Sequence, residues 1–247
     1  MASAVLRFLR ARAKLDELIA AGAAAGSIPF AEIDSLVENQ LFELKEECHW
    51  LYRRQEHADK VGASSAVLFD ILVGSLFHQC MKVKENSYQV EHYAPKYASL
   101  RKSLARPDTP KEAATFLKEG ERIIARSRRA LHQEFAYAVE LFNEAAIVLR
   151  HLLIENRENP VLIRTLVENE RLLDAVFGAN SLEKLFREMY GGHPAAGYLK
   201  AAGDLFEGGW YDRARELCKR ARKLDPRNKA GLELLKQINA AAHLHLA

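Results

Sequence analysis

Proline is absent from two long stretches of this 247-residue chain, between Pro29 and Pro95 and between Pro110 and Pro160. Because proline removes a backbone donor and clashes with the preceding turn of a helix, its absence over such lengths favours long helices over many short strands. No sustained alternation of apolar and polar residues with hairpin turns occurs. We therefore predict an all-α fold.

Composition excludes several other classes of protein. Apolar residues make up 49% of the chain and charged residues 28%, close to a soluble globular average, so a disordered or collagen-like chain is excluded. No run of about 18 uncharged apolar residues occurs, and we expect no membrane insertion. The three cysteines are widely spaced within apolar helical patterns, which predicts buried thiols in a reducing, cytoplasmic compartment. They are Cys48, Cys80 and Cys218.

Residues 1–158 are predicted to form a bundle of long helices. The segment Ala66–Met81 is apolar nearly all round, which indicates a helix in the middle of the bundle. Gly62 is expected to end the preceding helix, Ser64 or Ser65 to cap this one, and Pro95 to end or bend its continuation.

A second long helix is predicted over residues 110–156, with a break near Gly120 left open. Thr109 can cap it, Pro110 suits its first turn, and Glu112 completes a capping box. From residue 128 onward apolar residues repeat every seven positions, which keeps one apolar seam facing a neighbouring helix. The seam at 135–152 can pack inside the chain or against a second copy, so a homo-oligomer is one prediction.

Residues 159–247 predict shorter helices. Asn159 and Pro160 can begin one that Gly178 ends, and Asn180 with Glu183 forms a second capping signature. A final helix is expected over Asn228–Ala242. The prolines Pro160, Pro194 and Pro226 lie 34 and 32 residues apart, close to the period of a two-helix repeat.

The segment from Tyr198 to Pro226 resembles a tetratricopeptide repeat. The matching positions are Tyr198, Leu205, Gly209, Tyr211, Ala214, Ala221 and Pro226. One repeat earlier, a degenerate copy keeps only the apolar register, at Leu166, Leu173, Leu182 and Phe186. The resemblance covers about a third of the chain and implies paired helices that bind another protein. Leu199 and Gly203 stand where family members that grip a terminal carboxylate carry lysine and asparagine, so that binding mode is not implied.

Sequence motifs typical of metal, cofactor and catalytic sites are mostly absent. Glu46 and His49 form half of a di-iron motif whose second copy is absent, so we predict no metal and no cofactor. His78 is expected to be an inward, hydrogen-bonded residue of the apolar helix. No nucleophile motif, phosphate loop or dinucleotide fingerprint occurs, and the chain is predicted not to be an enzyme.

The predicted function is that of a cytoplasmic adaptor or scaffold that docks another protein through its helical-repeat surface. Leu199, Phe206 and Trp210 are the candidate contact residues, and the bundle would supply a second contact or self-association. The identity of the partner does not follow from the sequence.

Two basic segments suggest the alternative of nucleic-acid binding. Residues 96–129 hold ten basic and four acidic residues, and residues 212–229 hold eight and three. Rows of lysine and arginine residues can follow the phosphates of a nucleic acid. The acidic residues between them and the absence of alternating aromatic residues weigh against nucleic-acid binding without excluding it. Salt bridges to the acidic helix 32–47 are the competing explanation. The basic faces consist of Arg122, Arg126, Arg129, Arg215, Lys219 and Arg222.

Overall fold

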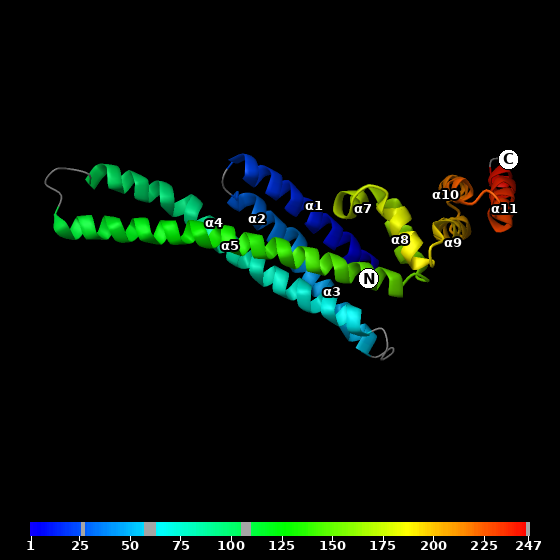
Figure 1. Cartoon of the computed structure of the whole chain (residues 1–247), viewed down its shortest axis with the longest axis horizontal. Helices are drawn as coiled ribbons and strands as arrows, with labels where there is room; N and C mark the ends of the chain where they lie inside the picture. The colour runs from blue at the N-terminus through cyan, green and yellow to red at the C-terminus, as the bar shows by residue number, and fades with distance from the viewer. Residues whose placement is uncertain (26–27, 57–62, 105–109, 246–247) are drawn as a thin grey trace. The chain divides into compact units, whose positions relative to one another are not determined.

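A computed structural model describes residues 1–25, 28–56, 63–104 and 110–245, and within these ranges all regular elements are helical (Figure 1). The all-α prediction is therefore confirmed. The first part contains α1 (Ala2–Ala25), α2 (Phe30–Leu36), the π-helix η1 (Val37–Leu41), α3 (Phe42–Glu56), α4 (Ala63–Leu104) and α5 (Lys111–Glu155). Shorter helices follow: α6 (Pro160–Glu168), α7 (Glu170–Phe177), α8 (Ser181–Met189), α9 (Pro194–Glu207), α10 (Tyr211–Leu224) and α11 (Lys229–His245).

Contacts between residues divide the chain into two compact units. The first unit combines Met1–Leu9 with Leu149–Ala247, and the second is Arg10–Val148. They are called here the repeat unit and the bundle unit, after the predictions made for these parts of the sequence. Helices α1 and α5 contribute residues to both units, and the division falls at Leu149 inside α5.

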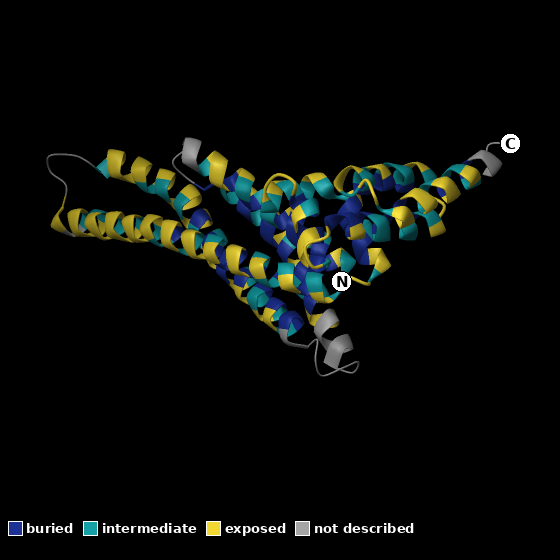
Figure 2. Ribbon diagram, turned by 45° about the vertical axis from the view of Figure 1, so that its right-hand side comes forward, coloured by how far each residue is buried: buried dark blue, intermediate teal, exposed yellow. Residues whose placement is uncertain are grey.

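The bundle unit has a core of large apolar side chains. Buried residues come from each of its helices, and Figure 2 shows them in dark blue. In the predicted seam, Ala138, Phe142 and Ala145 are fully buried, whereas Phe135 is half-buried. Other members of this core are Leu15, Leu18, Ile33, Leu36, Leu44, Phe69 and Leu76.

Helix α4 buries only one of its faces. Phe69, Val73 and Leu76 are buried, but Leu68 and Ile71 are more than half exposed, so the prediction of a helix surrounded on all sides is wrong. Apolar composition records how many apolar residues a helix has and not how many neighbours cover it. By length and composition, α4 is the one described helix that could cross a membrane; a core helix satisfies the same criterion.

Helices α4 and α5 both continue through a residue at which the sequence predicted an end or bend, for α4, or left a break open, for α5. Pro95 does not end α4, which continues to Leu104, and α5 is continuous over 45 residues through Gly120. The Tyr97 ring occupies the space where a Cβ on Gly120 would lie, and its hydroxyl donates to the Leu117 carbonyl. Contacts across the two helices therefore stabilise both segments.

Helix α4 begins at Ala63, ahead of Ser64 and Ser65, so its start does not fall at either serine predicted to cap it. The predicted stop at Gly62 and cap at Thr109 lie outside the described residues. Helix α5 begins directly after Pro110, as expected for a proline that precedes or opens a first turn.

In the repeat unit, one predicted cap is confirmed and another is wrong. The Asn159 side chain accepts a hydrogen bond from the Leu162 amide at 3.1 Å. Asn180 instead adopts a left-handed conformation with φ 60° and makes no capping bond. Asp174 replaces it, because its Oδ1 accepts from the Ser181 amide at 2.9 Å and from the Ser181 hydroxyl at 2.7 Å. The helix predicted to run to Gly178 is interrupted at Asn169.

Helices α9 and α10 form an antiparallel hairpin, and α11 packs against α10. The turn between α9 and α10 is closed by the Trp210 amide, which donates to the Leu205 carbonyl at 2.8 Å, and Gly209 has a φ of 80° there. The small side chains along the hairpin are buried between the helices. These buried residues are Ala201, Ala202, Ala214 and Ala221.

Candidate protein-binding surface

Trp210 lies at the turn between α9 and α10 with its side chain half exposed, at 49%. The Arg164 guanidinium of α6 is 4.4 Å from the centroid of its ring, a cation–π contact. Arg164 Nε is in turn 2.7 Å from the Glu168 carboxylate. The indole is therefore held in place by protein contacts while one side of it faces solvent.

Val161 extends this exposed area along α6. It precedes Arg164 by three residues, so both side chains lie on the same face of the helix, and it is exposed whereas Leu162, Ile163 and Leu166 are buried. We name Val161, Arg164 and Trp210 the Trp210 surface. Sequence reasoning missed Val161 and Arg164, although the one exposed apolar position in an otherwise amphipathic α6 was a signal for Val161.

The three predicted contact residues have different neighbours in the structure. Leu199 packs against α11, where a Cβ on Gly231 would lie 3.1 Å from the Leu199 Cδ2. Phe206 is half-buried with its ring centroid 5.9 Å from that of Tyr211. The Trp210 ring contacts Arg164 of α6. Of the three predicted residues, Leu199 and Phe206 are half-buried and Trp210 is the most exposed.

An open cleft of about 980 Å³ lies elsewhere in the repeat unit, beside the α8–α9 loop. It is lined by residues of both charges, including Arg157, Arg187, His193 and Asp225. At this cleft the Tyr190 hydroxyl donates to the Arg157 carbonyl at 3.3 Å, and burial raises the pKa of Tyr190 to about 12. The mixed charges favour no single class of ligand.

The basic faces are partly neutralised. Arg122 is 2.7 Å from Glu119, and Arg215 is 2.8 Å from Asp212. Within the described part of the chain, Arg126, Arg129 and Lys219 make no ion pair and are exposed, while Arg222 is half-buried near Gly231. Only some of the arginine and lysine side chains predicted to follow phosphates are therefore exposed and free of an ion pair.

The acidic stretch 32–47 pairs with other bases than those proposed from the sequence. Glu32 is 2.6 Å from Lys14 of α1, and Asp34 and Glu38 are 2.5 Å and 2.7 Å from Lys84 of α4. These hydrogen-bonded ion pairs raise the pKa of the Lys84 ammonium group above its ordinary value. For these three acids, the predicted salt bridges to the basic segments are wrong.

Groups capable of chemistry are dispersed over the described residues. Glu46 and His49 are exposed on α3, and the described residues hold no cluster of three His, Cys, Asp or Glu side chains suited to a metal. His78 is exposed with its ring 5.6 Å from Phe77, so its predicted inward placement is wrong. All three cysteines are free and buried, which confirms the prediction of buried thiols.

Comparisons with family models, with curated proteins and with solved structures found no match to this chain. Its function is inferred from the geometry of its own residues.

Proposed function

We propose that this chain is a non-enzymatic adaptor that docks a segment of another protein on the Trp210 surface. The observation that carries the proposal is a half-exposed indole held by Arg164, which is itself held by Glu168. Tryptophan and arginine are the residues most enriched among those that dominate binding energy at protein interfaces. A side chain already fixed in the free protein loses less conformational entropy when a partner covers it.

The surrounding helices support the same role. Alanines are buried between the helices of the α9–α10 hairpin, and α11 packs against α10; these two features support a tetratricopeptide-like assignment. Stacked helical hairpins present exposed faces along which peptides or helices bind. We propose the tetratricopeptide-like assignment for the hairpin and α11, with Trp210 at its turn as the principal contact.

Site-specific crosslinking in the native cell tests this function. A photoreactive phenylalanine analogue at position 210 should crosslink to a defined partner, whereas the same group at position 232 should not. Leu232 on α11 is a matched control because its side chain is exposed to a similar degree, 43%. Trp210→Ala should weaken capture of the crosslinked partner by about 30-fold, the effect of a residue worth about 2 kcal/mol.

Folding is checked by circular dichroism, and a second variant separates contact from structure. Arg164→Gln keeps the indole but removes the cation over it, so binding should weaken less than in Trp210→Ala. Equal crosslinking at positions 210 and 232, or full partner capture by folded Trp210→Ala protein, would overturn the proposal.

A further inference from the structure

A groove of about 530 Å³ runs between residues 89–100 of α4 and 116–127 of α5, both within the bundle unit. Figure 1 shows these two helices side by side there. The groove, called here the arm groove, has large apolar side chains open to solvent on both of its helices. The most exposed are Tyr93 and Leu100 from α4 and Phe116 and Ile123 from α5. Apolar side chains gathered in one groove of a soluble chain commonly mark a binding site.

The floor of the arm groove is a packed contact. A Cβ on Gly120 would lie within 2.8 Å of two carbons of the Tyr97 ring, so only glycine allows this ring to rest on α5. The Tyr97 hydroxyl donates to the Leu117 carbonyl below it. These contacts fix the spacing between α4 and α5, and the groove is therefore a built feature of the helix pair.

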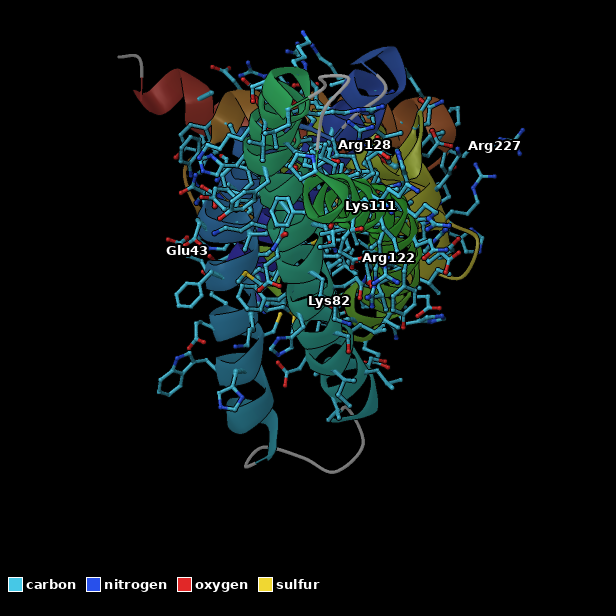
Figure 3. The ribbon with its side chains drawn as sticks, turned by 90° about the vertical axis from the view of Figure 1, so that its left-hand side faces the viewer. Glu43, Lys82, Lys111, Arg122, Arg128 and Arg227 are labelled. Carbon is cyan, nitrogen blue, oxygen red and sulfur yellow. The ribbon has the colours of Figure 1, made fainter. Side chains whose placement is uncertain are left out.

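Basic residues border this apolar floor. Lys96 lines the groove from α4, with its Nζ 5.7 Å from the Tyr93 ring centroid. On α5, Arg122 and Arg126 share a helix face with Glu119, which lines the groove. Arg122 and Arg128 leave α5 on different sides (Figure 3). The acidic residue among those lining the groove, Glu119, is 2.7 Å from Arg122.

We propose that the arm groove binds an amphipathic helix of a partner protein, with an apolar stripe that fits the floor and acidic residues that face the two rims. A groove between two helical ridges is complementary to a third helix. Opposite charge on the two sides would steer association and fix the register. The proposal concerns a surface separate from the Trp210 surface and does not depend on it.

Charge favours an acidic helix over a second copy of the same α4–α5 segment as the occupant of the arm groove. The segment 96–129 has ten basic and four acidic residues, so pairing two such segments face to face would bring like charges together, which disfavours association. A bilayer would present the anionic charge but not the convex ridge that fills a groove. An acidic helix provides both.

Selection from a peptide library tests the proposal. Phage would display helical peptides with apolar residues fixed at positions i, i+4 and i+7 and all other positions random, and would be selected on the full-length chain. We expect the selected peptides to be acidic. Their affinity should fall at least tenfold for a Phe116→Ser/Ile123→Ser variant and for Arg126→Glu, and should fall steeply with salt.

Control variants of the same chain distinguish binding in the groove from non-specific binding by exposed apolar side chains. Phe116 and Ile123 are 64% and 53% exposed, so their replacement should leave the fold intact by circular dichroism. Ile147→Ser is the matched control, because Ile147 is 61% exposed on the same helix and outside the groove. Neither this variant nor Trp210→Ala should change peptide affinity.

Four results would overturn the proposal. They are a selection that yields no binders, a selection of neutral or basic peptides, equal affinity for the double variant, and a face already covered by another occupant. Another occupant of the groove would be detected in one of two ways. The wild-type chain would self-associate in light scattering, or it would bind phosphatidylserine vesicles, and the double variant would abolish that association or binding.

Discussion

Gly197 and Gly203 lie less than two turns apart in α9, and their surroundings differ. A Cβ on Gly197 would lie within 2.8 Å of three atoms of Phe186. Phe186 is fully buried, so it has no room to move away. At Gly203, no heavy atom lies within 4 Å of the same position. Glycine is therefore required by packing at position 197 and not at position 203.

Alanine at these two positions should have opposite effects on stability. Gly197→Ala should lower the free energy of unfolding by about 1–3 kcal/mol, the usual cost of overpacking. Gly203→Ala should raise it by about 0.5–1 kcal/mol, since alanine restricts the unfolded chain and favours helix. Urea denaturation followed by circular dichroism measures both. A stabilising Gly197→Ala would show that α8 and α9 do not pack this closely.

Asp70 on α4 should make stability depend on pH. Burial raises the pKa of its carboxyl above the ordinary 3.8, and His49 and Lys45 oppose that shift. The folded state then holds this proton more tightly than the unfolded state, so stability falls as pH rises from about 4 through the raised pKa. Asp70→Asn should therefore be more stable than the wild type at pH 7 and equal to it at pH 3. An identical difference at both pH values would exclude this titration.

Helix α4 shows why a proline does not always end a helix within a folded protein. Proline removes one hydrogen bond of a helix, but the residues after Pro95 make contacts that the sequence does not reveal. Tyr97 packs on Gly120, and Arg101 forms an ion pair with Glu121 of α5. Partners in another helix keep this segment helical after the local signal to stop.

Gly120→Ala should loosen the pair of helices that these contacts join. The new methyl group would displace the Tyr97 ring, and amide hydrogen exchange should become faster in residues 89–104 and 116–127. Gly74→Ala is the control in the same unit, because no heavy atom lies within 4 Å of its Cβ position. It should leave exchange in both segments unchanged. Equal exchange in the two variants would mean that Tyr97 does not hold α4 and α5 together.

Helix caps show how far local sequence patterns are sufficient. Asn159 caps α6, and Asn228 accepts from the Gly231 amide at 3.1 Å at the start of α11; both acceptors lie three residues before their donors, within reach of a short motif. The cap of α8 comes from Asp174, seven residues before Ser181, and no four-residue motif predicts it.

The candidate site follows the same division. Trp210 is among the contact residues predicted from the sequence, but Arg164, whose guanidinium lies over its ring, is 46 residues earlier in the chain. The packing of Leu199 beside Gly231 of α11 is a property of tertiary structure that spacing along the chain does not predict. Spacing along the chain predicts which residues share a helix face and leaves open what covers that face.

For the whole molecule, the two units predict where a local change is felt. Gly197 and Phe186 both belong to the repeat unit. In the Gly197→Ala variant, amide hydrogen exchange should become faster within residues 149–245 and remain unchanged within residues 10–56 and 63–104. Mass spectrometry of peptic fragments measures this. Equal acceleration throughout the chain would mean that it unfolds as one cooperative unit.

The three buried cysteines have a practical consequence for spectroscopy. Burial raises the pKa of Cys80 to about 12 and that of Cys218 to about 11, and it also raises the pKa of Cys48. The raised pKa values disfavour the reactive thiolate at neutral pH, and burial shields all three cysteines from reagent. A cysteine introduced at Leu232 should then react with a maleimide dye while the native thiols stay unmodified. Fluorophores could be attached without first removing any natural cysteine.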